Sequence, residues 1–127
     1  MQNPFSSSAR PRFADKGEIL AIARQTALRI AREHPEVLKI LLFGSFARHD
    51  YGARSDLDLL ILLAHSDQPP RERITDFLRC LSKYPTDLLV LTQAELDSRL
   101  ADGDLFLRRA LSEGILLYPE SDESESR

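Results

Sequence analysis

The sequence is poor in the residues on which disulfide-bonded and thiol-dependent proteins rely. Cys80 is the single cysteine among 127 residues, so no internal disulfide can form. It lies in an apolar-patterned stretch with Leu78 and Leu81, which predicts a buried thiol. We therefore expect neither zinc binding nor thiol chemistry.

Long apolar runs and an excess of basic charge are also missing. No run approaches the ~20 apolar residues of a membrane-spanning helix, and the N-terminus, MQNPFSSSARPR, lacks the apolar core of a signal peptide. We expect a cytoplasmic protein without a membrane contact. Because 17 Lys and Arg residues are outnumbered by 20 Asp and Glu residues, the formal net charge is −3. No global field would then attract nucleic acid, and we expect no direct nucleic-acid partner.

The length suits one ordinary domain. Hydrophobic residues make up 43% of the chain and charged residues 29%, a balance typical of globular proteins. Residues 1–14 and 119–127 lack hydrophobic periodicity, which predicts flexible tails around a domain at 15–118; the second tail is acidic and serine-rich. Such a domain is too small to add a separate substrate domain, so the acceptor of any transfer reaction is expected on another molecule.

Short apolar runs predict the strands of a sheet. Three of them, 37–43, 57–64 and 87–92, have the length and boundaries of buried strands. The first two are joined by too few residues for a parallel crossover, so they should be antiparallel. The second and third are separated by an apolar helical face within 70–82, which predicts a parallel crossover. A final short run, 115–118, predicts an edge strand.

Two further segments of the domain have the hydrophobic periodicity of helices. Residues 16–34 place apolar side chains three and four apart and stop at Pro35, which predicts an amphipathic helix. Residues 93–113 predict one or two helices broken near Asp102 and Gly103. The element order predicts an α/β protein with a small mixed sheet flanked by helices.

Acidic and small residues collect where the predicted strand ends meet. The end of the first strand and the starts of the next two should lie at one edge of the sheet. Gly44 and Ser45, Asp56 and Asp58, and Asp87 would then converge there. Side chains two apart on a strand project to the same face, so Asp56 and Asp58 should point together while the residue between them enters the core.

This set of residues suits a metal-bound polyphosphate. Carboxylates are hard oxygen ligands that favour Mg²⁺, with Mn²⁺ as an alternative, and phosphate oxygens and water complete the coordination. Asp87 would add a second metal position, as in two-metal phosphoryl transfer. Gly44 permits close approach of the backbone to a phosphate, and Ser45 offers a hydroxyl and an N–H. Arg48 would either neutralise phosphate charge or face solvent.

The spacing of these residues resembles a known signature. Gly44-Ser45, followed after ten residues by Asp56-Leu57-Asp58, resembles the motif of the DNA polymerase β-like nucleotidyltransferase superfamily. The string GSFARHDYGARSDLDLLIL is similar to the minimal nucleotidyltransferase branch, although His49 stands where that branch often has glycine. The resemblance covers roughly residues 37–92. It implies the polymerase β-like fold and magnesium-dependent transfer of a nucleoside monophosphate, with Asp56, Asp58 and Asp87 as catalytic metal ligands.

The resemblance also implies a biological role. Many minimal nucleotidyltransferases resemble the antitoxin partner of a helical HEPN ribonuclease toxin, which they silence by transferring AMP from ATP to a toxin tyrosine. We therefore expect a protein adenylyltransferase that acts as an antitoxin, alone or within a homo- or hetero-oligomer. Two alternatives stay open: an antitoxin that masks its partner by contact, and a transferase for a small molecule such as an aminoglycoside.

Overall fold

A mixed sheet of four strands forms the centre of the protein in a computed structural model, which describes residues 16–48 and 56–120. The strands are β2 (Val37–Phe43), β3 (Leu57–Leu63), β4 (Thr86–Thr92) and β5 (Ile115–Tyr118), and their order across the sheet is β4-β3-β2-β5. β2 runs antiparallel to β3 and β5, whereas β3 runs parallel to β4. Both predicted pairings are thus confirmed, and β5 is an edge strand as expected.

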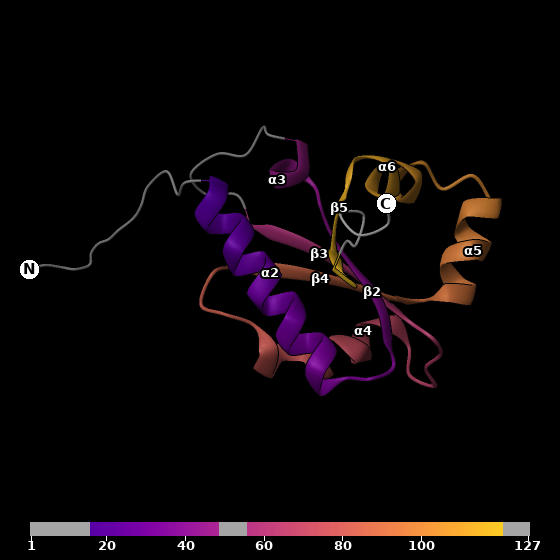
Figure 1. Ribbon diagram of the computed structural model, residues 1–127. Coiled ribbons are helices and arrows are strands. Elements are labelled where there is room, and N and C mark those ends of the chain that lie inside the picture. Colours follow the sequence, from indigo (N-terminus) through magenta and orange to yellow (C-terminus); the bar gives the residue numbers. More distant parts are fainter. Residues whose placement is uncertain (1–15, 49–55, 121–127) are drawn as a thin grey trace, which may run out of the picture.

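Helices cover both faces of this sheet (Figure 1). One face carries α2 (Lys16–Glu33) and the segment formed by α4 (Pro70–Arg73) and the 3₁₀ helix η1 (Ile74–Cys80). The other face carries α5 (Gln93–Ala101) and α6 (Leu105–Glu113), while the single turn α3 (Ser45–Arg48) follows β2. None of the described helices is long and apolar enough to cross a membrane. The predicted tails lie outside the described residues, except for residues 119 and 120.

The apolar core has two halves because β3 is covered on both sides. Leu59 and Ile61 face the cluster beneath α2 and η1, whereas Leu60 and Leu62 face the cluster beneath α5 and α6. Six of the seven β3 residues are therefore buried, which explains the continuous apolar run in the sequence. The exception is the half-buried Asp58, a polar residue in an otherwise apolar central strand.

The segment at 70–82 differs from the predicted single helix. After one turn of α-helix it continues as a 3₁₀ helix, in which every third residue lies on the same side. Phe77 and Cys80 are buried and Ile74 packs against the same cluster, so the buried side has a period of three. Leu78, which a 3.6-residue period placed on the apolar face, is 52% exposed.

A buried arginine connects this segment to β4 and α5. Arg73 is 3% exposed and donates hydrogen bonds to the carbonyl oxygens of Gln68 (2.8 Å) and Val90 (3.1 Å). It also pairs with both carboxylate oxygens of Glu95, at 2.7 and 2.8 Å. Glu95 accepts a hydrogen bond from the backbone N–H of Thr92 within a capping box at the start of α5. The Arg73–Glu95 pair thus connects α4 to α5 and to the end of β4 that is remote from Asp87. No sequence pattern identified this pair.

The Arg73–Glu95 ion pair makes the free energy of unfolding depend on pH. The hydrogen bonds from Arg73 lower the pKa of Glu95 from 4.5 to about 2. A lowered pKa in the folded state contributes stability above the ordinary value, and this contribution is lost as the pH falls toward 2. Because the Glu95 side chain is 37% exposed, solvent screening reduces the effect. We expect the free energy of unfolding to fall by about 1–2 kcal/mol more in the parent than in Glu95→Gln over this range.

Urea unfolding at several pH values measures the difference. Glu113→Gln is the matched control, because Glu113 is similarly exposed at 38% but pairs with an exposed arginine. Because Glu113→Gln keeps the Arg73–Glu95 pair, its free energy of unfolding should stay within about 0.5 kcal/mol of the parent's at every pH. Parallel pH profiles for the parent and Glu95→Gln would contradict a stabilising role for the pair.

Candidate functional site

Asp58 lies at the centre of the candidate site. It pairs in register with Phe43 on β2 and with Asp87 on β4. Register partners on neighbouring strands project to the same face, so these three side chains share the face that α5 and α6 cover. The fully buried Leu57 projects to the opposite face, as the alternation predicted.

Gly44 approaches Asp58 from the end of β2. Its φ of +78° lies in the left-handed region, and a Cβ built at this position would collide with a carboxylate oxygen of Asp58. Only glycine satisfies both conditions without strain. Ser45 then opens α3, whose Phe46 and Ala47 are buried. These two side chains anchor the turn, so the Gly44-Ser45 backbone is held at the edge of the sheet beside Asp58.

The remaining acids are more exposed. Asp56 immediately precedes β3, and the adjacent N–H of Leu57 donates a hydrogen bond to the carbonyl oxygen of Pro85 at 3.0 Å. Both Asp56 and Asp87 are exposed. Among the described residues, the three aspartates do not form a group whose ligand atoms all lie within 4.8 Å of one another. The structure therefore brings Asp58 and Asp87 to one register, with Asp56 at the same edge.

A pocket of about 270 Å³ opens beside these residues, between the sheet and α6. It is lined by Phe43, Gly44, Asp58, Phe106, Arg109, Ala110 and Glu113. Phe106 is 55% exposed and packs edge-on against Phe43, with 5.7 Å between ring centroids. Arg109 pairs with Glu113 at 3.1 Å. The pocket thus combines a carboxylate, an exposed aromatic ring and a cation.

The motif does not include the residues that α6 contributes to this pocket. Phe106, Arg109 and Glu113 match no part of it. Their spacing along α6, at positions 106, 109, 110 and 113, is that of one helix face and was the available signal. It could not show which part of the sheet that face meets.

Part of the motif lies outside the described residues. The segment 49–55 contains Gly52 and Ser55, which match the motif of the minimal nucleotidyltransferase branch, and His49, which departs from it. The Arg48 side chain is likewise not described, although its backbone ends α3. The described part of the site edge therefore consists of Gly44, Ser45 and the three aspartates.

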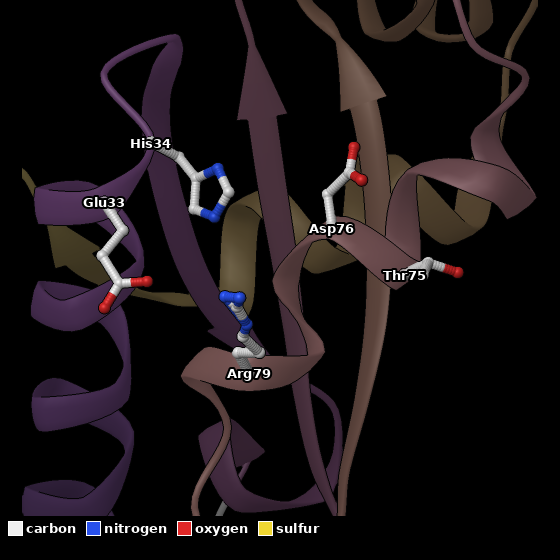
Figure 2. Close-up of a pocket in the computed structure, with 5 residues that line it drawn as sticks. All are labelled: Glu33, His34, Thr75, Asp76 and Arg79. Carbon is white, nitrogen blue, oxygen red and sulfur yellow. The ribbon is translucent and has the colours of Figure 1, made fainter.

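A second, larger pocket of about 490 Å³ lies on the opposite face of the sheet (Figure 2). Glu33 and His34, at the end of α2, form one side, and residues of the 3₁₀ segment, among them Asp76 and Arg79, form the other. Because His34 precedes the start of β2 while Gly44 follows its end, the two pockets lie at opposite ends of that strand.

At this edge of the mixed sheet, a glycine turn meets carboxylates carried by neighbouring strands. Residues 25–123 match the family described as polymerase beta, nucleotidyltransferase. The chain belongs to this nucleotidyltransferase family. The expected fold and enzyme class are thus confirmed. No curated protein sequence matches the chain.

Solved structures share the fold. A protein of Sulfolobus solfataricus, provisionally assigned as a nucleotidyltransferase, superposes with a TM-score of 0.60 at 24% identity, over 80% of both chains. A toxin–antitoxin complex with AMP-PNP gives a TM-score of 0.51 at 19% identity, over 81% of this chain and 78% of the matched chain. At these identities the likeness concerns the fold.

Replacing Gly44 tests whether its contact with Asp58 shapes the site. Gly44→Ala should lose about 1–2 kcal/mol of unfolding free energy from the left-handed backbone and should also displace the Asp58 carboxylate. Affinity for Mg-ATP, measured by calorimetry, should fall at least ~10-fold, since ~1.4 kcal/mol of lost binding energy has this effect.

Gly103→Ala is the matched control for the backbone cost. Gly103 also has a positive φ, +84°, but no atom lies within 4 Å of a Cβ built there. It should lose comparable stability and keep its nucleotide affinity. Equal affinities in the two variants would refute the role of the Gly44–Asp58 contact.

Proposed function

We propose that the chain transfers AMP from magnesium-bound ATP to a hydroxyl group of a partner protein. The observation that carries the proposal is the half-buried Asp58, packed against Gly44 and in register with Asp87 at the mouth of a pocket. Family membership supports nucleotide transfer as the reaction. The AMP-PNP in the toxin–antitoxin neighbour supports ATP as the nucleotide.

The donor set fits the metal that this reaction uses. Asp56, Asp58 and Asp87 offer only carboxylate oxygens, the ligands that Mg²⁺ prefers, and Mg²⁺ needs few protein ligands when phosphates supply others. The space beside Asp58 is kept free of a side chain by Gly44. When bound, Mg²⁺ neutralises phosphate charge and makes the acceptor hydroxyl more acidic.

The chain's own residues mainly position the reactants. The Gly44 backbone lets the β and γ phosphates approach, and Ser45 offers them its hydroxyl and N–H. The acceptor oxygen bonds to the α phosphorus as the bond to the bridging oxygen breaks, and pyrophosphate leaves. In this proposal the exposed Asp87 carboxylate takes the hydroxyl proton. Positioning and charge neutralisation of this kind supply most of the catalysis in phosphoryl transfer.

The proposed acceptor is a tyrosine of a helical HEPN ribonuclease toxin, and AMP transfer would silence that toxin. The toxin–antitoxin neighbour supports a partner of this kind. Leu105, 76% exposed at the start of α6, adds an apolar side chain next to the pocket. Exposed apolar side chains beside a transfer site favour a protein acceptor over a polar small molecule.

Label transfer from ATP tests the reaction. Incubated with the co-purified partner, Mg²⁺ and α-labelled ATP, the parent should label the partner protein. Asp58→Asn should reduce the rate at least ~100-fold, as expected when a group that stabilises transition-state charge is lost. Asp97→Asn, an exposed change on α5 outside the pocket, should leave the rate unchanged.

The same variant separates catalysis from simple masking. If the chain acts by transfer, Asp58→Asn should no longer relieve growth arrest by the partner, whereas Asp97→Asn should relieve it. Full relief by Asp58→Asn would identify contact as the inhibitory mechanism, and an unlabelled partner would contradict AMP transfer.

Phe106 is the expected contact for the nucleotide base. Its exposed ring borders the pocket, and stacking of a base on an aromatic side chain contributes about 1–3 kcal/mol. Phe106→Ala should therefore raise the KM for ATP about 10-fold with little change in kcat. Leu105→Ala, which removes a more exposed apolar side chain outside the pocket lining, is the control. A changed kcat with an unchanged KM would instead place Phe106 at the acceptor.

A further inference from the structure

Three side chains with different ligand atoms converge where α2 ends. Within the described ranges, Glu33, His34 and Cys80 each place one ligand atom within 4.8 Å of the other two. Glu33 and His34 come from the end of α2, whereas Cys80 is the last residue of η1. The cluster therefore bridges two elements that are far apart in the sequence. Cys80 is buried, His34 is half-buried and Glu33 is exposed, so the cluster extends from the core to the surface.

The thiol and the carboxylate already have the spacing of two ligands on one ion. Cys80 Sγ lies 3.4 Å from Glu33 Oε1. In a tetrahedral zinc site, with Zn–S near 2.3 Å and Zn–O near 2.1 Å, these atoms are about 3.6 Å apart. The other carboxylate oxygen, Oε2, pairs with Arg29 at 3.4 Å, so the carboxylate is oriented with Oε1 toward the thiol.

The imidazole of His34 has two further contacts. His34 Nδ1 lies 3.5 Å from Glu36 Oε2, and the ring packs on Phe77 with 4.5 Å between centroids. A carboxylate at one ring nitrogen directs the other nitrogen to a metal in many metal sites. Figure 2 shows the imidazole projecting from the end of α2 into the space between α2 and η1.

The surroundings leave room for a hydrated ion. The cluster borders the pocket of about 490 Å³ that Asp76 and Arg79 also line. Three protein ligands leave one tetrahedral position open for water. Binding of the ion to the thiolate form of Cys80 releases the thiol proton to solvent.

We propose that Cys80, His34 and Glu33 bind Zn²⁺, on the opposite face of the sheet from Asp58. A thiolate, an imidazole and a carboxylate form a donor set that suits zinc and is unlike the all-carboxylate set proposed for Mg²⁺. The bound ion joins the end of α2 to the end of η1. The sequence alone had argued against zinc binding, because it contains a single cysteine and no ligand motif. The other two ligands lie 46 and 47 positions away from Cys80.

Cobalt substitution tests the site independently of nucleotide transfer. The full chain, prepared without a histidine tag and titrated with Co²⁺, should develop a thiolate-to-cobalt charge-transfer band that Zn²⁺ abolishes. Carboxylates alone cannot produce this band, so Co²⁺ bound at Asp58 does not imitate it. Cys80→Ser should lose the band, and His34→Gln should weaken Zn²⁺ affinity at least 10-fold in competition with a chromogenic chelator. Glu36→Gln should retain the band with affinity reduced about 10–100-fold.

His65→Gln is the matched control, because His65 is an exposed histidine in the loop after β3. It should retain both the band and the affinity. Zn²⁺ should raise the thermal unfolding midpoint of the parent and of His65→Gln, but not that of His34→Gln, whose circular dichroism must match the parent's. Absence of the band in the parent, or its persistence in Cys80→Ser, would overturn the proposal. Equal Zn²⁺ affinity in His34→Gln and His65→Gln would do so as well.

Discussion

The carboxylate of Asp58 packs against the backbone of Gly44, which has no side chain. Three features hold it there: the register of β3 with β2, the left-handed turn at Gly44, and the anchoring of α3 through buried Phe46. The register cannot shift by one residue, because such a shift would turn Asp58 to the opposite, apolar face of the sheet. The candidate site thus depends on the register of β3, whose buried residues fix the position of Asp58, the one polar residue of this strand.

One end of the sheet carries the candidate site, and the other end carries the buried ion pair. At one end, Asp58 lines a pocket completed by α6, and Asp87 is its register partner on β4. At the other end of β4, buried Arg73 fixes the start of α5 through Glu95. The acids of the candidate site and the Arg73–Glu95 pair thus lie toward opposite ends of β4. Stability and nucleotide binding should therefore respond to different substitutions.

The sequence predicted most of the fold because the buried strands are continuous apolar runs. β2 has the predicted bounds, and β3 and β4 differ from prediction by one residue each. The prediction of a single helix over 70–82 was wrong, because the buried side of this segment has a period of three rather than the 3.6 of an α-helix. Strand order also placed Asp58 and Asp87 together, which the register confirms. Their roles as metal ligands remain predictions.

What the sequence could not predict depends on contacts between distant segments. Phe106 and Arg109 reach the pocket only because α6 packs across the sheet beside Gly44. Glu95 and Arg73 are 22 residues apart, and Cys80 and Glu33 are 47 apart. Each residue has an ordinary local explanation as a surface charge or a core thiol. Tertiary packing alone assigns them to an ion pair or to a ligand cluster.

The most direct measurement is an NMR titration of the labelled full chain with a non-hydrolysable ATP analogue and Mg²⁺. We expect amide shift changes to cluster at Gly44, Ser45, Asp58, Asp87 and the Phe106 face of α6. Residues around Glu33 and Cys80, on the other face of the sheet, should remain unperturbed. Saturable changes centred on the α2 side, or no saturable change at Gly44 and Asp58, would contradict a nucleotide site at this edge of the sheet.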